Sequence, residues 1–437
     1  MFGTSGIRGP VGEDVTAALA LSVGRALGVD ADRVVVGRDA RESGRLLVDA
    51  LTAGLRESGT DVVDLGLAAT PTVARSVARE GADAGVAVTA SHNPAPDNGI
   101  KLWQPSGQAF DSERQDAVAE RVREGVADLR PWDELGDRTR RDGAAAHVET
   151  LADAVDADLS ELSVAVDLGN GAGGVTVEAL QRLGCDVETL NAQPDGSFPG
   201  RPSEPTAENC ASLAALVAST DADLGIAHDG DADRMRCVAA DGTYLSGDVT
   251  LALLARAAAE PGERVAAPVD TSLAVDDHLA EIDVTVERTR VGDVYVAERA
   301  SQEGVAFGGE PSGAWIWPAE TLCPDGPLAA CKIAALAAER PLVDRLAEIE
   351  TYPIRRDAVE TDEKAAVMDR VRERVRAEYD DVTTLDGVRV DLGDAWFLLR
   401  ASGTQPIVRI TAEARDEGRA ASVFERARDL LTDAAEA

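Results

Sequence analysis

The segment HDGDADR, residues 228 to 234, carries three aspartates at alternate positions. In an extended loop such positions point to one side, so Asp229, Asp231 and Asp233 are expected to converge. Their carboxylates would offer hard oxygen ligands, and ligation by few protein oxygens favours Mg²⁺, which keeps positions open for phosphate. An EF-hand is excluded, because it needs Gly and Glu where this chain has Arg234 and Ala240. The alternative is a solvated acidic turn.

The segment TASHNP, residues 89 to 94, places Ser91 beside a histidine and an asparagine after an apolar run. Ser91 is a candidate for covalent chemistry. Taken alone, the segment is more typical of a turn, because a serine hydroxyl readily bonds the nearby backbone. The other motifs must decide between these interpretations.

The segment RASGTQPIVRI, residues 400 to 410, concentrates hydrogen-bond donors near the end of the chain. Hydroxyls and amides can surround a phosphate while guanidinium groups add bidentate contacts. The candidate phosphate ligands are Arg400, Ser402, Gly403, Thr404 and Arg409. A tight turn between two strands explains the same segment equally well.

Three shorter segments place polar side chains in or near glycine-rich loops. FGGEPSGAW, residues 307 to 315, contains Glu310 and Ser312, and a carboxylate there could accept hydrogen bonds from two neighbouring sugar hydroxyls. GTSGIRG, residues 3 to 9, contains Arg8, and DNGIK contains Lys101. Each would be an ordinary surface residue if it occurred alone.

One segment has the sequence pattern of a dinucleotide-binding loop. GNGAGG, residues 169 to 174, matches the glycine pattern and follows an expected strand. The acidic residue expected after the next strand is replaced by Asn191. A glycine-rich turn from strand to helix is therefore the favoured interpretation.

The elements that must position these residues follow an α/β pattern. Short β-branched runs beginning at residues 33, 163 and 264 are each followed by a helical pattern, which indicates parallel α/β units in three comparable domains. The polar stretch 131–147 is interpreted as a connector. After residue 351 we expect a helix, the strands GVRVDL, AWFLLRAS and IVRITAEA, and a closing helix, which is typical of a small α+β domain.

Composition narrows the classes of partner. The 437 residues include 79 acidic and 43 basic ones, and the net charge of −36 argues against nucleic acid or an anionic membrane surface. Only three of the basic residues are lysines, which indicates adaptation to high salt; unchanged activity in dilute buffer would contradict this hypothesis. The content of apolar residues, 44%, favours a folded protein over a disordered one.

The remaining features predict a soluble, cytoplasmic protein. The five cysteines form no Cys-x-x-Cys pair and are interpreted as reduced thiols. The N-terminal residues contain no apolar segment typical of a signal peptide, and charges interrupt the later apolar stretches.

The order of the motifs resembles that of the alpha-D-phosphohexomutase superfamily, which includes phosphoglucomutases, phosphomannomutases and phosphoglucosamine mutases. The order is an Arg loop, a serine loop, a triple-Asp loop, a Glu-x-Ser-Gly loop and an Arg-x-Ser-Gly-Thr loop, and it covers essentially the whole chain. The opening FGTSGIRG is most similar to archaeal phosphoglucosamine mutases. The resemblance implies three similar α/β domains with mixed sheets (1–146, 147–248 and 249–350) and a C-terminal α+β domain (351–437) around a central cleft.

The same resemblance implies a role for each candidate residue. Ser91 would be the phosphorylated serine, and its phosphoryl group would bind Mg²⁺ together with Asp229, Asp231 and Asp233. Around the reacting phosphate would lie Arg8, Lys101 and Arg234. Glu310 and Ser312 would bind sugar hydroxyls, and the five donors of residues 400–409 would bind the other phosphate. A sugar bisphosphate would activate the enzyme, which we expect to be a monomer or a homodimer.

Two residues depart from the usual family pattern. Ala314 and Gln405 replace the common His and Glu. Ala314 lies in the loop to which the resemblance assigns sugar recognition, so it keeps a pentose phosphate open. On the resemblance, glucosamine 6-phosphate is the first choice, mannose and glucose phosphates follow, and ribose phosphate comes last. A phosphatase with an aspartyl nucleophile would need Asp-x-Asp-x-Thr, which DGDAD lacks, and a nonenzymatic sugar-phosphate-binding protein is the third alternative. How Ser91 is first phosphorylated is left open.

Overall fold

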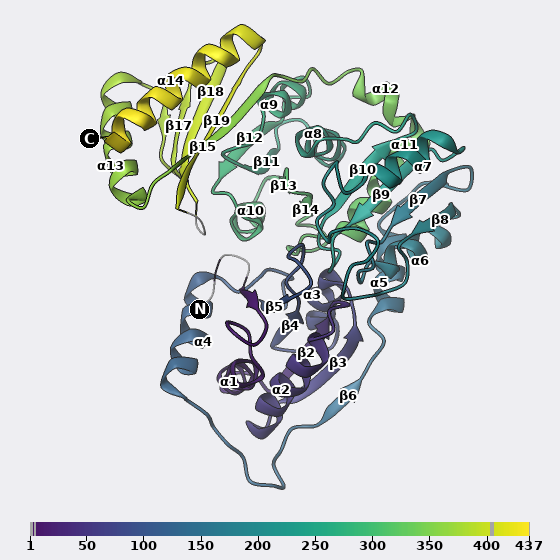
Figure 1. Cartoon of the computed structure of the whole chain (residues 1–437). Helices are drawn as coiled ribbons and strands as arrows, with labels where there is room; N and C mark the ends of the chain where they lie inside the picture. Colours follow the sequence, from purple (N-terminus) through teal and green to yellow (C-terminus); the bar gives the residue numbers. More distant parts are fainter. Residues whose placement is uncertain (1–2, 4–5, 403–405, 437) are drawn as a thin grey trace. The chain divides into compact units, whose positions relative to one another are not determined.

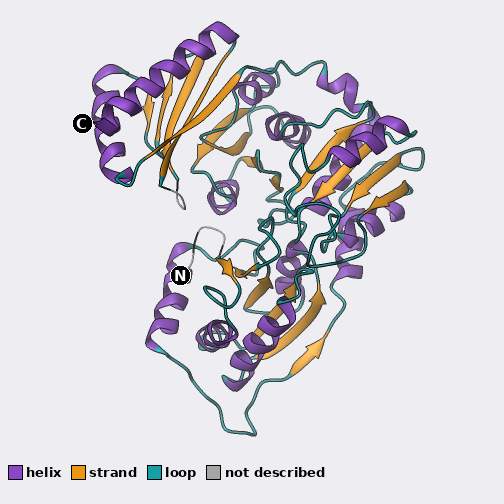
Figure 2. Ribbon diagram, viewed as in Figure 1, coloured by secondary structure: helices purple, strands orange, loops and turns teal. Residues whose placement is uncertain are grey.

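The computed structural model describes residues 3, 6–402 and 406–436. The chain divides into two compact units, one of Met1–Thr250 with Ser312–Leu346 and the other of Leu251–Pro311 with Ala347–Ala437. Helix α8, Gly247–Ala258, crosses the division along the chain. Helices and strands alternate over most of the described residues (Figure 2).

The first unit begins with a six-stranded sheet in the order β1-β5-β4-β2-β3-β6 (Figure 1). Strands β2, β3, β4 and β6 run parallel, while β1 and β5 pair antiparallel. Side chains alternate across the sheet, so Val34 and Val36 enter one apolar core and Val35 enters another. The bounds are β1 Ile7–Pro10, α1 Ala17–Leu27, β2 Arg33–Arg38, α2 Gly44–Glu57, β3 Asp61–Leu67, α3 Thr70–Arg79, β4 Ala84–Val88, β5 Asp97–Trp103, α4 Ser112–Glu124 and β6 Arg138–Arg140.

A second sheet of the first unit has the order β10-β9-β7-β8. Strands β7, β8 and β9 are parallel, and β10 returns antiparallel to β9 through a short loop. That loop contains the triple-Asp motif. The bounds are α5 Ala144–Asp153, β7 Ser163–Asp167, α6 Gly174–Arg182, β8 Asp186–Leu190, α7 Ala211–Ser219, β9 Leu224–His228, β10 Met235–Ala239, β14 Ala314–Ile316, α11 Gly326–Glu339 and α12 Leu342–Leu346.

The second unit contains a parallel β12-β11-β13 arrangement and a five-stranded antiparallel sheet in the order β15-β19-β18-β17-β16. Helices α13 and α14 cover one face of the antiparallel sheet, where Phe397 and Leu399 are buried (Figure 1). The bounds are β11 Arg264–Pro268, α9 Leu273–Ala280, β12 Thr285–Thr289, α10 Asp293–Ala300, β13 Val305–Glu310, β15 Ile354–Glu360, α13 Lys364–Glu378, β16 Val382–Thr383, β17 Val388–Asp391, β18 Ala395–Ala401, β19 Ile407–Ala414 and α14 Glu417–Glu436.

The predicted class, α/β domains with mixed sheets and a C-terminal α+β part, is confirmed. The interpretation of 131–147 as a mere connector is wrong in part. Its residues 138–140 form β6, which pairs with β3, and α5 begins at Ala144. This strand has only three residues, all exposed, so it lacks the apolar pattern by which strands are predicted.

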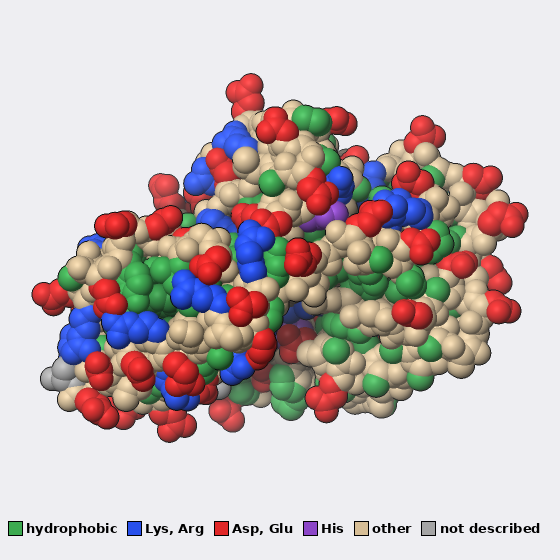
Figure 3. Space-filling view, turned by 90° about the horizontal axis from the view of Figure 1, so that it is seen from above, with side chains coloured by type: hydrophobic (Ala, Val, Ile, Leu, Met, Phe, Trp, Pro, Cys, Tyr) green, Lys and Arg blue, Asp and Glu red, His purple; other side chains and the backbone are tan. Residues whose placement is uncertain are grey.

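The surface agrees with the acidic composition. Asp and Glu side chains are spread over the face seen in Figure 3. In the described parts of the chain, every helix is too short or too polar to cross a membrane.

Candidate active site

Ser91 lies in a tight loop between β4 and β5 and has an unusual backbone conformation. Its φ of 53° falls in the left-handed region, which non-glycine residues rarely adopt. Its amide donates to Thr89 Oγ1 at 2.8 Å, and its carbonyl accepts from Arg41 Nη2 at 2.8 Å and from Ser203 Oγ at 2.9 Å. The surroundings therefore hold this backbone in place, as expected for strain at a functional position.

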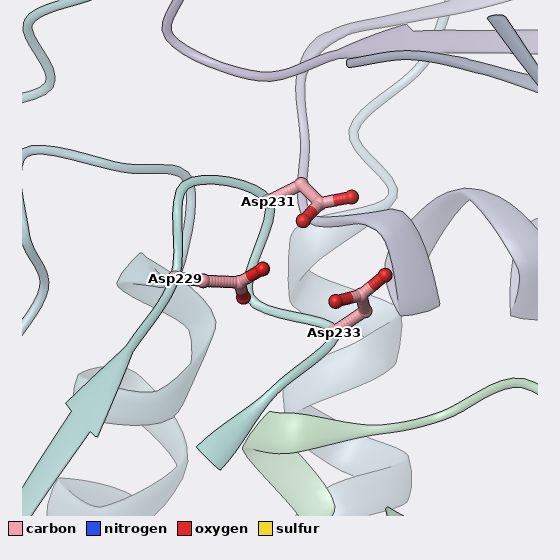
Figure 4. A group of neighbouring side chains, drawn as sticks. All are labelled: Asp229, Asp231 and Asp233. Atoms are coloured by element: carbon pink, nitrogen blue, oxygen red, sulfur yellow. The ribbon is translucent and has the colours of Figure 1, made fainter. Parts of the chain in front are cut away.

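The triple-Asp loop joins β9 to β10, and its three carboxylates converge (Figure 4). One oxygen of each of Asp229, Asp231 and Asp233 lies within 4.8 Å of the others, and all three residues are buried. The physical reason differs from the one predicted, because the loop is a compact turn with Ala232 at φ 55° rather than an extended segment.

The serine loop and the triple-Asp loop meet at one hydrogen bond. Ser91 Oγ donates to Asp229 Oδ2 at 2.6 Å, whereas His92 Nδ1 lies 3.4 Å from the same hydroxyl. Burial, together with the positive charges of Arg234, Arg8 and Lys101, lowers the pKa of His92 to about 3. The His92 side chain is consequently neutral near pH 7.

Lys101 lies against the aspartates. Its Nζ donates to Asp231 Oδ2 at 2.8 Å and to Asp233 Oδ2 at 2.5 Å. Burial alone would lower the pKa of Lys101, but the two carboxylates outweigh burial and raise the pKa above its ordinary value. Lys101 is therefore charged at every physiological pH.

Two arginines add positive charge at the same place. Arg8, on β1, pairs through its backbone with Gly99 of β5, and its charge acts on Asp231, Lys101 and His92. The Arg234 amide donates to Asp229 Oδ1 at 3.2 Å. The first unit thus brings together Ser91, three carboxylates and three cations.

The carboxylates repel one another. Burial and the charges of Asp233 and Asp231 raise the pKa of Asp229 well above its ordinary value. Burial would also raise the pKa of Asp231, but Lys101 and other donors hold it below its usual range. Asp231 Oδ1 is buried and has no hydrogen-bond partner among the residues the structure describes. Such a set of hard oxygen donors fits a divalent cation.

The predicted phosphate ligands lie in the second unit. Arg400 on β18 is directly opposite Arg409 on β19, which places two positive side chains on one face of the sheet. Ser402 is buried next to them, and its amide bonds Ile407 O at 2.9 Å. Gly403 and Thr404 lie outside the described residues, as does Gln405.

The predicted sugar-binding pair is divided between the two units. Glu310 ends β13 in the second unit, and its carboxylate accepts from the Gly292 amide at 3.0 Å. Ser312 belongs to the first unit, in the turn that leads into β14. Ala314 is buried there and forms a β-bridge with Arg234.

Three residues that no sequence motif singled out support the two loops of the site. Thr70 Oγ1 donates to Asp231 Oδ2 at 2.6 Å, and Arg41 and Ser203 bind the serine loop. For Arg41 the sequence offers one weak signal, because the segment GRDARESG at 37–44 places Asp39 and Arg41 directly after a strand.

The glycine-rich turn at 169–174 supports the triple-Asp loop. The Ala172 amide donates to Gly230 O at 3.0 Å, and a Cβ at Gly171 would lie only 2.7 Å from that oxygen. Asn191 donates to Asp167 Oδ1 at 2.9 Å. Close backbone packing therefore explains Gly171, in agreement with the favoured interpretation of this turn.

Four family models match the chain in succession. They are described as phosphoglucomutase/phosphomannomutase alpha/beta/alpha domain I (residues 1–127), domain II (145–242), domain III (246–352) and the C-terminal domain (357–430).

Individual proteins are similar over nearly the full chain. A Methanopyrus kandleri protein named "Probable phosphoglucosamine mutase" is 47% identical, with 98% of this chain and 97% of that protein covered. A solved phosphoglucomutase/phosphomannomutase family protein from Burkholderia thailandensis is 29% identical, with a TM-score of 0.87 over 99% of this chain and 98% of that one. N-acetylphosphoglucosamine mutase of Aspergillus fumigatus, solved with GlcNAc-6P and magnesium, shares the fold at 17% identity, with a TM-score of 0.62 over 99% and 96%.

Proposed function

Because this chain belongs to the phosphoglucomutase/phosphomannomutase family, we propose that it interconverts the 6-phosphate and 1-phosphate of one sugar through a phosphorylated Ser91. The observation that carries the proposal is the 2.6 Å contact between Ser91 Oγ and Asp229 inside a buried group of three carboxylates and three cations. The preferred substrate is glucosamine 6-phosphate, in line with the name of the Methanopyrus relative.

The proposed reaction has two phosphoryl transfers. In the first, the bond between phosphorus and Ser91 Oγ breaks, and phosphorus bonds to the free sugar hydroxyl; the proton that the hydroxyl loses balances the one that Ser91 gains. The resulting bisphosphorylated sugar turns over, and its other phosphoryl group returns to Ser91. Such transfers depend on positioning and on neutralising charge over the phosphoryl oxygens. His92, neutral and 3.4 Å from the hydroxyl, is not required as a base.

Mg²⁺ is the proposed metal. Asp229, Asp231 and Asp233 would hold it together with a phosphoryl oxygen on Ser91. Asp231 Oδ1 supports this assignment, because it is buried without a hydrogen-bond partner in the described part of the chain. When bound, the ion would offset negative charge on the transferring group. Lys101, Arg8 and Arg234 would surround the same group with donors.

The remaining assignments concern the substrate. Arg400, Ser402 and Arg409, with Gly403 and Thr404, would bind the phosphate that does not react, while Glu310 and Ser312 would bind sugar hydroxyls. Arg400, which also pairs with Asp386 at 3.4 Å, lies directly opposite Arg409, and this supports the role because two guanidinium groups at neighbouring positions can donate to one phosphate. Ala314 leaves the choice of sugar to experiment. A sugar bisphosphate would act as the activator.

Parallel mutase assays test the proposal. The protein is assayed at high salt with glucosamine, mannose and glucose 6-phosphates and with ribose phosphate, each with a catalytic amount of sugar bisphosphate. We expect the glucosamine product to form fastest and intact-mass analysis to find one phosphoryl group on Ser91. Steady release of inorganic phosphate, or ligand binding with no product from any of the four, would refute a mutase.

A further inference from the structure

Arg41 is fully buried and lies beneath the serine loop. Among the candidate residues that the structure describes, its side chain hydrogen-bonds only Ser91, at the backbone carbonyl. Its Nη2 donates to the carbonyls of Ser91 (2.8 Å) and Asn93 (2.6 Å). Its Nη1 donates to the carbonyls of Pro94 (2.6 Å) and Asp97 (2.8 Å). The remaining donor, Nε, bonds Asp39 Oδ2 at 2.9 Å.

The guanidinium group therefore uses all of its donors. Four backbone carbonyls from residues 91 to 97 converge on one side chain, and a buried carbonyl without a partner is costly. A planar group with five N–H bonds in a fixed arrangement can satisfy such a set, whereas a lysine ammonium offers three donors from a single point. The ring of Phe198 lies 5.0 Å from the guanidinium carbon, which closes the remaining side.

Both backbone polar groups of Ser91 are connected to Asp39 through one intervening residue. The Ser91 amide bonds Thr89 Oγ1 (2.8 Å), and Thr89 Oγ1 donates to Asp39 Oδ2 (2.7 Å). The Ser91 carbonyl bonds Arg41, whose own amide donates to Asp39 Oδ1 (2.9 Å). This closed set of hydrogen bonds opposes relaxation of Ser91 from φ 53° to an ordinary conformation.

Ser203 extends the same set to the triple-Asp loop. Its hydroxyl donates to Ser91 O at 2.9 Å and accepts from the Gly230 amide at 3.0 Å. One hydroxyl thus sets the spacing between the serine and the residues that follow Asp229.

We infer that Arg41 is the positioning residue that keeps Ser91 in its left-handed conformation, with Ser203 linking that conformation to the triple-Asp loop. The inference rests on the proposed function for its kinetic consequence. Arg41 touches neither the reacting oxygen nor the second unit's phosphate ligands in this scheme, so its loss affects phosphoryl transfer more than substrate affinity. A displacement of about 1 Å at a reacting group costs about 100-fold in rate.

The test compares Arg41→Lys and Ser203→Ala with the wild type and with Arg389→Lys. Arg389 is a buried arginine of the second unit whose side chain bonds Val269 O and lies over Trp396, neither of which is a candidate site residue. We expect Arg41→Lys to lower kcat by about 100-fold and Ser203→Ala by about tenfold, with KM within about twofold of wild type. Arg389→Lys should lose thermal stability and keep its kcat.

Hydrogen exchange supplies a readout that needs no mutase activity. The peptide covering residues 88–98 should exchange faster in Arg41→Lys and Ser203→Ala than in the wild type and the control. Wild-type kcat together with unchanged exchange in a folded Arg41→Lys protein would overturn the inference. If Arg41→Lys does not fold, the same outcome in Ser203→Ala overturns it. An inactive wild type would instead refute the proposed function. The hydrogen-exchange comparison would then still test whether Arg41 holds the serine loop in place.

Discussion

Ser91 Oγ and Asp229 Oδ2 lie 2.6 Å apart although 138 positions separate them along the chain. The bond places a serine hydroxyl in a left-handed loop against a buried carboxylate whose pKa is raised by burial and by its two aspartate neighbours. A phosphoryl group on that oxygen would extend among the same carboxylates and cations.

Ser91→Ala removes the proposed carrier of the phosphoryl group. We expect kcat to fall by at least about 10³-fold, because Ser91 is the residue proposed to accept the group, while the unfolding temperature stays close to that of the wild type. Steady-state assays and intact-mass analysis after incubation with sugar bisphosphate measure this. Ser106→Ala, at an exposed turn, serves as the control. Near wild-type turnover in Ser91→Ala would remove the covalent step.

Asp231→Asn should abolish Mg²⁺ binding and lower activity strongly. The change deletes one of three converging charges and disturbs the bonds to Lys101 and Thr70, so we expect a loss of about 10²- to 10³-fold in kcat. Calorimetric titration with Mg²⁺ and rate measurements at graded Mg²⁺ check both effects. Asp241→Asn, in an exposed turn, should behave as the wild type. An Asp231→Asn protein that responds to Mg²⁺ like the wild type would show that the triple-Asp loop is not the metal site.

Gly230→Ala should push the two loops apart. A Cβ at Gly230 would lie 2.8 Å from Ser203 Oγ and 2.9 Å from Ser91 O, closer than real Cβ contacts allow. We expect about 1–3 kcal/mol of destabilisation and a fall in kcat of about 10- to 100-fold. The matched control is Gly174→Ala, where a Cβ meets nothing within 4 Å. Equal kcat values for these two variants would contradict the prediction.

Arg409→Ala should raise KM more than it lowers kcat, because the proposed phosphate site at residues 400–409 binds a phosphate that does not react. Loss of a bond to a charged group costs about 1.5–3 kcal/mol, or about 10- to 100-fold in KM. Stability should change little, since Arg409 is exposed on β19. Arg372→Ala, on the exposed face of α13, is the control. A change in kcat alone would contradict the assigned role.

Asp325→Asn should change how stability depends on pH. Burial raises the pKa of Asp325, but Arg75 at 2.7 Å and His147 at 3.3 Å outweigh burial and hold the pKa well below its usual range. A carboxyl with a depressed folded-state pKa stabilises the protein above its unfolded pKa of about 3.9, and the contribution is lost as pH falls through the folded value.

The wild type should therefore exceed Asp325→Asn in stability by about 3–5 kcal/mol near pH 7. The difference should shrink as the pH falls from about 5 to 2, which urea unfolding at constant salt can follow. Asn keeps an oxygen for the Leu328 amide at the start of α11, so the helix cap is preserved. Asp369→Asn, at an exposed ion pair, is the control. A difference that is independent of pH would contradict the assignment.

The elements around the site were predictable because their signals are local. The β-branched runs at 33, 163 and 264 are β2, β7 and β11, and the C-terminal strands and helices occur in the expected order. Strand β6 was not predictable from the sequence, because its three residues are all exposed and show no apolar pattern. The strand is defined by its backbone pairing with β3. The connector interpretation failed for that reason.

The candidate residues were predictable to different degrees. Asp229, Asp231 and Asp233 stand out by spacing, although a tight turn at Ala232 brings them together rather than an extended loop. Arg41, Thr70 and Ser203 gave little signal, because they act through hydrogen bonds to backbone groups or carboxylates far away in the sequence.

The amino-acid sequence by itself determined the family order of the motifs and the side chains that can carry phosphoryl transfer, since hydroxyl, carboxylate and guanidinium chemistry belongs to the residue type. Only the tertiary structure decided that Ser91 adopts a left-handed backbone conformation and that Arg41 donates hydrogen bonds to four backbone carbonyls of residues 91–97. Backbone strain and carbonyl pairing depend on which distant segments pack together, and no local pattern of side chains encodes that.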